Sequence, residues 1–272
     1  MRLAALCLTA LLLSAPANAQ VRDPAWPDLR AELYGDRVLH EAGSAIVINA
    51  PYRTKDDART QISASILAPR GKVIDNVSLI LDENPMPVSA VFDFAEPLPG
   101  FFFDVTMRVN GPTPVHVVAE TTDGQLYVAE TFVKTSGLGA CSAPPGTDPD
   151  LALATLGQMD ITIETVKRTA SLGEKLSAMS SGTKQVDVDI SHPSHSGMQM
   201  DQISLLFIPM RYVENVEIGL DGKGYVDVTG SISLSENPRM SLSAPARTQS
   251  VDVTMTDTDG FVSKASKSVA GF

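Results

Sequence analysis

The sequence predicts an all-β protein with two β-sandwich domains joined by a flexible loop rich in Gly, Pro and Ala. Aromatic residues make up only 6% of the chain, which contains 19 Gly and 18 Pro, and this composition favours strands and turns over helical bundles. Short segments with the alternation typical of strands recur between turn residues in two parts of the chain. Between these parts, residues 137–150 have the composition of a loop or linker.

The N-terminal residues 1–19 are typical of a secretory signal peptide. They contain Arg2, an apolar run that continues to Leu13, and small residues at Ala17 and Ala19 before an expected cleavage at Gln20. The sequence therefore predicts an exported protein, located in a bacterial periplasm.

The mature chain is expected to keep one cysteine, Cys141, because Cys7 lies inside the leader. In an oxidising compartment structural cysteines normally occur in pairs, so a lone thiol suggests reactivity or an intermolecular disulfide. We expect no metal site on this thiol, because none of the histidines shows ligand spacing with it. The histidines are His40, His116, His192 and His195.

The charge and hydropathy of the chain argue against several classes of partner. The formal net charge is -11 and becomes more negative when the leader is removed with Arg2. This excess of acid argues against nucleic acid and anionic lipid as partners. After the leader, no run approaches the roughly 18 apolar residues that a membrane span needs, so we expect no membrane span.

The first half, residues 20–136, is predicted to form one sandwich after a short helix at Trp26–Gly35. Its turns include D-E-N-P-M-P and T-D-G-Q, and about seven short strands at this spacing are typical of an antiparallel sandwich. The expected strands are Ser44–Asn49, Gln61–Leu67, Val73–Leu81, Val88–Phe94, Phe101–Val109, Val115–Thr121 and Leu126–Lys134.

The second half, residues 185–272, is predicted to form the other sandwich after a connecting segment at 151–184. In that segment we expect a short helix at Leu151–Gln158, capped by Asp148 or Asp150, and a strand in M-D-I-T-I-E-T-V. Strands are then expected from Gln185 and at Gln202–Ile208, Val213–Leu220, Gly224–Val228, Ser231–Leu234, Met240–Leu242, Gln249–Thr256 and Phe261–Ser266.

The two halves share turn motifs. D-E-N-P at Asp82–Pro85 has a counterpart in S-E-N-P at Ser235–Pro238, and T-T-D-G near Asp123 resembles T-D-T-D-G near Asp259. Such turns are common, so two interpretations stay open. The halves are either related modules or two unrelated β domains that use ordinary turn chemistry.

The cysteine lies in T-S-G-L-G-A-C-S-A-P-P-G, among residues with very small side chains. We predict a flexible, exposed arm that includes Gly137, Gly139, Ala140 and Ser142 around Cys141. No histidine is near in sequence, and at an unperturbed pKa of about 8.5 only a few per cent of the thiol would be ionised at neutral pH. A slim arm with a thiol and no local base suits a carrier that presents a covalently held group to another protein.

Longer motifs carry a resemblance to a known pair of proteins. N-V-S-L-I-L-D-E-N-P-M-P-V-S-A-V-F-D-F and V-A-E-T-F-V-K-T-S-G-L-G-A-C resemble SoxY, the sulfur-carrier subunit of bacterial thiosulfate oxidation. I-S-H-P-S-H-S-G-M, F-I-P-M-R-Y-V and S-I-S-L-S-E-N-P-R-M-S-L are similar to SoxZ, its partner. The whole chain resembles the fused SoxYZ-like carriers associated with quinoprotein dehydrogenases.

The resemblance implies an immunoglobulin-like sandwich in each half and a carrier cysteine that maps onto Cys141. It makes His192, Pro193, Asn237 and Pro238 features of the fold. The family's arm ends in G-G-C-G-G at the chain terminus, whereas this sequence has G-L-G-A-C-S-A and continues to residue 272.

Three functional hypotheses follow, none of which needs a cofactor. In the first, a periplasmic carrier without catalytic machinery of its own holds a sulfur-containing intermediate on Cys141 for sulfur-oxidising (Sox-type) enzymes or a related dehydrogenase system. In the second, the protein is a non-covalent accessory that docks to an exported quinoprotein (PQQ) dehydrogenase. In the third, Cys141 is a nucleophile aided in space by His116 or His192. A disulfide-linked homodimer through Cys141 is a further prediction.

Overall fold

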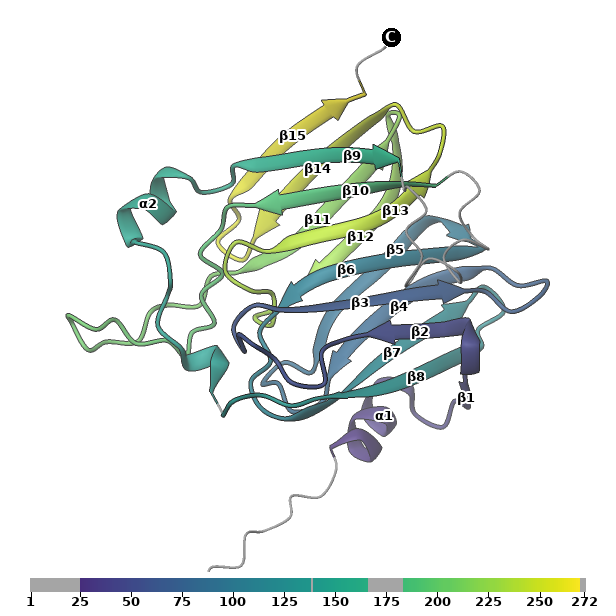
Figure 1. Cartoon of the computed structure of the whole chain (residues 1–272), viewed down its shortest axis with the longest axis horizontal. Coiled ribbons are helices and arrows are strands. Elements are labelled where there is room, and N and C mark those ends of the chain that lie inside the picture. The colour runs from purple at the N-terminus through teal and green to yellow at the C-terminus, as the bar shows by residue number, and fades with distance from the viewer. Residues whose placement is uncertain (1–24, 138, 166–182, 270–272) are drawn as a thin grey trace, which may run out of the picture.

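The computed structural model of the chain describes residues 25–137, 139–165 and 183–269, and is built mainly from β-strands (Figure 1). The predicted leader lies outside these residues. The helices are α1 (Trp26–Tyr34), η1 (Gly43–Ala45), η2 (Ala140–Ser142) and α2 (Pro149–Ala154). The strands of the first half are β1 (Leu39–Glu41), β2 (Ile46–Asn49), β3 (Thr60–Leu67), β4 (Ile74–Leu81), β5 (Val88–Leu98), β6 (Gly100–Met107), β7 (Thr113–Thr121) and β8 (Leu126–Val133). The later strands are β9 (Met159–Thr165), β10 (Thr183–Ile190), β11 (Val213–Leu220), β12 (Lys223–Gly230), β13 (Arg239–Pro245), β14 (Ser250–Asp257) and β15 (Val262–Ser268).

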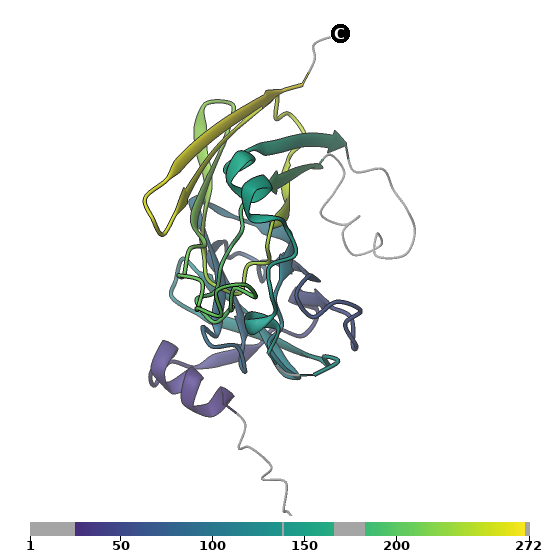
Figure 2. The same ribbon diagram turned by 90° about the vertical axis from the view of Figure 1, so that its left-hand side faces the viewer.

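The strands form two sheets that face each other, as the turned view in Figure 2 shows. The larger sheet has nine strands in the order β1-β8-β7-β4-β5-β12-β11-β14-β15, and the smaller has six in the order β2-β3-β6-β13-β10-β9. The prediction of an all-β protein with two immunoglobulin-like sandwiches is therefore confirmed.

The two halves are joined edge to edge within both sheets. In the larger sheet β5 pairs with β12, with Phe92 opposite Val228, and in the smaller sheet β6 pairs with β13, with Phe103 opposite Leu242. One cluster of buried apolar side chains runs through both halves between the sheets. The halves are therefore held together by backbone hydrogen bonds and a shared core, in addition to the chain that links them.

Alternating sequence patterns explain why the strands form where they do. In β14, Val251, Val253 and Met255 are buried in the core, and Asp252 between them faces outward. Successive side chains of a strand point to opposite faces of the sheet. A segment with this alternation is therefore stable in a sheet that has one face covered by the core.

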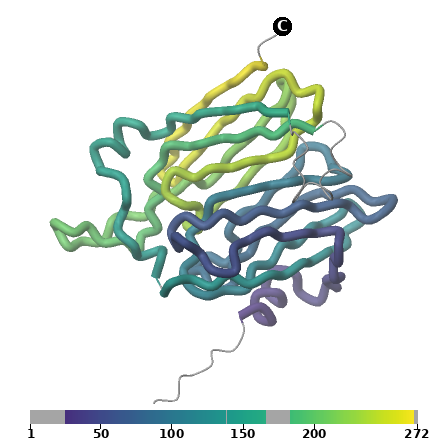
Figure 3. The backbone as a smooth tube through the Cα atoms, viewed as in Figure 1, coloured from purple at the N-terminus to yellow at the C-terminus, as the bar shows by residue number. Residues whose placement is uncertain are grey.

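The structure differs from the sequence-based prediction at three short segments. The predicted strand Gln202–Ile208 belongs to an irregular loop between β10 and β11, which Figure 3 traces as a projection from the body of the molecule. The predicted strand Ser231–Leu234 is a turn closed by a hydrogen bond from the Leu234 amide to the Ser231 carbonyl. The unpredicted strand β1 has only three residues and pairs in parallel with β8.

The helix α1 covers one end of the larger sheet. Its Trp26 and Tyr34 lie against a small apolar cluster that includes Ile80 and Val118, and the Trp26 ring stacks on His116 with 3.6 Å between ring centroids. No helix in the described ranges is long and apolar enough to span a membrane.

Candidate functional site

The site is built around Cys141, which lies in the single-turn helix η2 between β8 and α2. The structure contradicts the predicted exposure of this thiol, because Cys141 has a relative exposure of 0%. The small residues around it lie at the junction of the two halves, and groups from both halves cover the turn. The small residues next to Cys141 in the sequence predicted a free arm. Contacts from segments that are distant in the sequence instead bury Cys141.

Hydrogen bonds from the first half hold the start of this turn. Asn110 accepts a bond from the Gly139 amide at its carbonyl (2.7 Å) and another from the Cys141 amide at its side-chain oxygen (3.1 Å). Gly139 has a φ of 95°, a left-handed conformation that glycine adopts without strain. The glycine therefore turns the backbone so that both amides meet Asn110.

Hydrogen bonds from the second half hold the end of the turn. The Ser196 hydroxyl donates to the Cys141 carbonyl, and Gln199 donates from Nε2 to the Ala143 carbonyl at 2.8 Å. Both side chains are buried. The backbone of the cysteine turn is thus bound on one side by the first half and on the other by the second.

The first of the two Glu-Asn-Pro turns noted in the sequence supports the start of the cysteine turn. Asn84 donates to the Arg108 carbonyl (2.8 Å) and accepts from the Asn110 amide (2.9 Å), which fixes the segment that holds Cys141. Asn84 also donates to the Ser233 hydroxyl of the second half at 2.9 Å.

The second Glu-Asn-Pro turn supports the segment that follows the cysteine. Glu236 accepts hydrogen bonds from the Gly146 and Thr147 amides, each at 2.8 Å, and Asn237 donates to the Thr147 hydroxyl at 3.3 Å. The two Glu-Asn-Pro turns therefore bracket the cysteine segment, one from each half.

The electrostatics of the site keep the thiol protonated. Burial raises the pKa of Cys141, and the guanidinium of Arg108 lowers it by a smaller amount, so the net direction is upward. In the described residues neither His116 nor His192 is hydrogen-bonded to the thiol, because each is engaged elsewhere. His116 Nδ1 lies 2.9 Å from Asp82 Oδ1 beneath the Trp26 ring.

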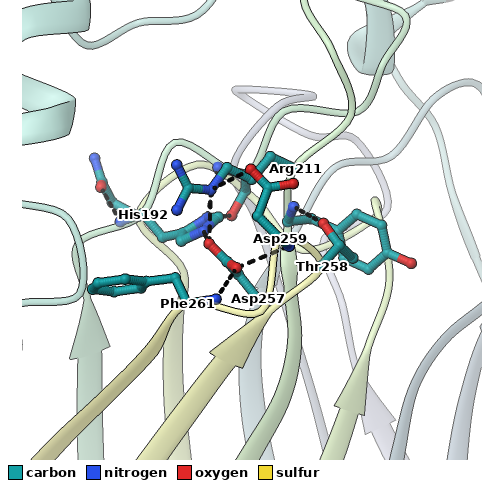
Figure 4. Close-up of polar contacts among 9 residues, drawn as sticks. His192, Arg211, Asp257, Thr258, Asp259 and Phe261 are labelled. Atoms are coloured by element: carbon teal, nitrogen blue, oxygen red, sulfur yellow. Dashed lines mark hydrogen bonds and ion pairs between the residues drawn. The ribbon is translucent and has the colours of Figure 1, made fainter.

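His192 belongs to a buried polar network at the β14–β15 turn (Figure 4). Its Nδ1 accepts from the Ser194 amide at 2.9 Å, so Nε2 carries the proton and donates to Asp257 Oδ2 at 3.2 Å. Arg211 donates to the same carboxylate oxygen at 2.7 Å and lies 3.2 Å from Asp259. Burial lowers the pKa of His192, so it is a neutral structural group.

This network anchors both ends of the segment that covers Cys141. His192 is at the start of the segment and Arg211 is at its end, and both bind Asp257. Burial raises the pKa of Asp257, but bonds from Arg211, the Phe261 amide and His192 outweigh it, so the carboxylate stays ionised. Asn237 completes the anchor, because it accepts from the His192 amide at 3.0 Å. The roles that the family resemblance implied for His192 and Asn237 agree with these contacts.

A groove with a volume of about 750 Å³ lies beside the cysteine turn. One wall is the chain after the cysteine, from Pro144 to α2, and the other is the loop from Met200 to Arg211. The tip of this loop is apolar and exposed, with Ile203 at 94% and Phe207 at 67% relative exposure. Groups of three or more potential metal ligands are not found in the described ranges.

The predicted arm residues divide between the surface and the interior. Gly137 and Ser142 are exposed, Gly139 is half-buried, and Ala140 is buried with Cys141. The sequence analysis missed the residues that hold and face the turn, which are Asn110, Ser196, Gln199 and Arg108. The shared Glu-Asn-Pro turns were the one signal in the sequence that pointed to this junction.

The fold and the site define a two-module β-sandwich protein with one buried thiol, among the residues that the structure describes, at the junction of the modules. The family model for the sulfur oxidation protein SoxY matches residues 30–141, and that for the sulphur oxidation protein SoxZ matches residues 175–268. The chain therefore contains a SoxY domain followed by a SoxZ domain and is a fused SoxYZ-like protein. The SoxY match ends on Cys141.

Comparison with solved structures gave matches of low overall similarity. The sulfur carrier protein SoxY from Chlorobium limicola f thiosulfatophilum is 25% identical, with a TM-score of 0.33 over 41% of this chain and 96% of that chain. A β-glycosidase from Bacteroides vulgatus is 7% identical, with a TM-score of 0.22 over 82% of this chain and 24% of that chain. A 1.5-MDa bacterial ice-binding adhesin is 13% identical, with a TM-score of 0.21 over 82% of this chain and 62% of that chain. The curated proteins gave no match.

Proposed function

We propose that this protein is an exported periplasmic carrier that holds a sulfur-containing intermediate covalently on Cys141 and presents it to enzymes of sulfur oxidation. One observation carries the proposal. The lone cysteine of the described chain lies where the SoxY match ends and is held by both the SoxY and the SoxZ domain. In the described residues the two histidines proposed as bases, His116 and His192, are bound to Asp82 and Asp257. In this proposal, loading and processing of the cargo therefore belong to partner enzymes.

The buried thiol represents a closed state of the carrier. Outside η2 itself, the backbone from Gly139 to Ala143 is held mainly by Asn110, Ser196 and Gln199. Because each such bond contributes only about 0.5–1.5 kcal/mol net, the turn can open without unfolding either sheet. Loading takes place in the open state, and closure shields the cargo from water and stray thiols.

The partner docks, in this proposal, on the loop beside the groove. Exposed apolar side chains gathered on a projecting loop are typical of a protein–protein contact, and this loop adjoins the segment that covers Cys141. We expect the double change Leu206→Ser and Phe207→Ser to weaken binding of the partner enzyme at least tenfold. Val262→Ser, at another exposed apolar residue, serves as the control.

The carrier role is tested by intact-mass analysis of the protein isolated from its native periplasm during turnover. We expect a fraction with added sulfur, with or without bound oxygen, that reverts to the free-thiol mass after treatment with dithiothreitol. Cys141→Ala should carry no such mass and should not support oxidation. A uniformly free thiol together with full function of Cys141→Ala would contradict the proposal.

A second candidate function is a non-covalent accessory for an exported quinoprotein dehydrogenase. The fully buried thiol and the exposed apolar loop favour it, since docking needs only the loop. In that case Cys141→Ser would co-purify with the dehydrogenase and support its activity at the wild-type level. Loss of function with retained binding would assign the role to the thiol.

A further inference from the structure

A second pocket, with a volume of about 410 Å³, lies on the outer face of the smaller sheet. Its lining comes from residues 49–59, which lead from β2 to β3, and from side chains of β3 and β6. In β6, Phe103 and Val105 are buried in the core, so Asp104 between them faces outward into the pocket. This pocket shares no lining residue with the groove beside the cysteine turn.

Asp104 is a half-buried acidic group on the sheet side of this pocket. In the described ranges its carboxylate has no hydrogen bond and no ion pair. The residues opposite it in the neighbouring strands are Ser63 and Ser241, whose small side chains leave space beside it. Their hydroxyls donate elsewhere, to the Asn49 carbonyl (3.4 Å) and to Asp187. A half-buried carboxylate without a partner is unfavourable, so this group is suited to a ligand that donates hydrogen bonds to it.

Three cationic side chains line the other side of the pocket, in a chain whose formal net charge is -11. They are Arg53, Lys55 and Arg59, and none of them forms an ion pair with a carboxylate of the described residues. Arg59 donates only to backbone carbonyls of the second Glu-Asn-Pro turn. The carboxylate of Asp56, which also lines the pocket, accepts from the Ala58 amide at 3.0 Å. These unpaired cations are suited to an anionic group of a ligand.

The loop that carries the three cations is held in place before any ligand binds. The buried Thr54 hydroxyl donates to Asp57, which also accepts from the Ser136 amide at 3.0 Å. The buried Thr60 hydroxyl donates to the Asp56 carbonyl at 2.9 Å. A ligand therefore meets a loop whose ordering cost is already met by internal bonds.

We propose that this pocket binds a small zwitterion of the amino-acid class, with its carboxylate at Arg53, Lys55 and Arg59 and its ammonium group at Asp104. An ammonium group has three donors and no acceptor, so it supplies the partner that Asp104 lacks. A simple anion would leave Asp104 unpaired, and a simple cation would leave the loop unpaired. The binding does not involve Cys141, so the inference stands or falls independently of the carrier role.

The first consequence concerns the ligand-free protein. Burial raises the pKa of Asp104 to about 6, so its ionised form destabilises the folded state at neutral pH. We therefore expect Asp104→Asn to raise the thermal midpoint of the free protein by about 2–4 °C at pH 7.5. An equal or lower midpoint would show that the carboxylate is satisfied without a ligand, which would overturn the inference.

The binding test uses calorimetric titration of the mature protein at pH 7.5 with three matched sets of probes. The first set is the straight-chain amino acids from glycine to 6-aminohexanoate, and the others are the monocarboxylic acids and the monoamines of the same chain lengths. We expect at least one amino acid to bind at least tenfold more tightly than both the acid and the amine of its length. Equal affinity of the acid or of the amine, or no binding by any probe, would overturn the inference.

Substitutions at the two sides of the pocket should separate the two ends of the ligand. Asp104→Asn should lower the affinity of the amino acid about 10- to 100-fold without weakening binding of the acid. The double change Arg53→Gln and Lys55→Gln should weaken both. Lys223→Gln, at an exposed lysine of the larger sheet, is the control and should change neither. Equal effects of the control and the pocket variants would overturn the inference.

The pH dependence gives a readout that needs no variant. Between pH 7.5 and 5.5 the ionised fraction of Asp104 falls about fourfold, so the affinity of the wild-type protein for the amino acid should fall by about that factor. The affinity for the matched acid should not fall. The other charged groups around Asp104 are Asp187 and Arg239 on neighbouring strands and Arg53, Lys55, Asp56 and Arg59 on the loop.

Asp104→Asn separates Asp104 from these neighbours, because its affinity for the amino acid should not change over the same pH range. A fall that persists in this variant would overturn the assignment of the ammonium group to Asp104. If the variant does not fold, the wild-type profiles decide, and a flat profile for the amino acid would overturn the inference.

Discussion

At the scale of single residues, a few polar side chains determine the state of Cys141. Asn110 from the first half and Ser196 and Gln199 from the second bind the backbone around the thiol, and none of them is close to it in sequence. Burial raises the pKa of the thiol. A buried, protonated cysteine is chemically inert, so access to it depends on how often these bonds open.

We predict that Gln199→Ala speeds the reaction of Cys141 with an aromatic disulfide reagent about fivefold. The change removes the bond to the Ala143 carbonyl, and a loss of about 1 kcal/mol shifts the opening equilibrium accordingly. The rate is followed by absorbance of the released thiol. Gln249→Ala, which removes an exposed amide bonded only to its neighbour Arg247, is the control, and equal rates for the two variants would contradict the prediction.

His192 should make the protein sensitive to mild acid. Burial lowers its pKa in the folded state, so below the unfolded value of about 6.5 the unfolded chain binds the extra proton and stability falls as pH decreases. The slope from one such group is at most about 1.4 kcal/mol per pH unit.

The measurement is the free energy of unfolding of wild type and His192→Gln between pH 7.5 and pH 5. We expect the variant to be less stable at pH 7.5 but to lose less stability on acidification. Burial raises the pKa of Asp104 to about 6, so this carboxyl group stabilises the folded state as pH falls. The effect is the same in wild type and in His192→Gln and cancels in the comparison. His40→Gln, at an exposed histidine, is the control, and an unchanged slope in His192→Gln would show that another group dominates.

At the scale of elements, turns and short helices place the site. The helix α2 begins at a side-chain cap, because Asp148 accepts from the Asp150 and Leu151 amides at 3.0 and 3.2 Å. It ends before Gly157, which has a φ of 75° and whose amide donates to the Ser191 carbonyl at 2.8 Å. This glycine therefore joins the groove wall to the SoxZ domain.

We predict that Gly157→Ala destabilises the protein more than Gly124→Ala. Both residues have positive φ, which costs about 1–2 kcal/mol for alanine, but a Cβ at Gly157 would lie 2.6 Å from the Phe261 ring, whereas nothing lies within 4 Å at Gly124. Overpacking adds about 1–3 kcal/mol. The added Cβ would also lie 2.8 Å from the Ser263 Cβ. Urea unfolding measures both variants, and equal losses would mean that Phe261 and Ser263 move aside at no cost.

At the scale of the whole molecule, the two domains are joined through both of their sheets. The pairs β5–β12 and β6–β13 extend both sheets across the domain boundary, and the core is continuous. The cysteine turn lies on this boundary, so its closed state depends on how the domains are joined as well as on the local bonds.

We predict a single cooperative thermal transition for the mature chain. Separation of the domains would expose the shared core and break two strand ladders at once, so neither half should melt first. Calorimetry of Cys141→Ser, which removes oxidation as a complication, should give equal calorimetric and van't Hoff enthalpies. Two resolved transitions would show that the domains unfold independently.

Most strands were predictable because their signal is local. Alternating apolar and polar residues in segments such as V-D-V-T-M indicate a strand with one buried face. This signal does not depend on which strands lie next to it in the sheet. The cap of α2 was predictable for the same reason, because Asp148 and the amides it binds are consecutive. The predicted strand Gln202–Ile208 was wrong because its apolar residues lie on an exposed loop, and composition cannot distinguish a buried strand from such a loop.

The chain's order of residues alone was enough to establish the all-β class, the two modules, the lone Cys141 and the resemblance to SoxY and SoxZ. The three-dimensional arrangement was needed to bury that cysteine and to bring Arg108 and Gln199 to it. The physical reason is that burial and electrostatic pairing depend on contacts between segments far apart in the chain. Small neighbours made Cys141 look exposed, whereas the joined domains enclose it.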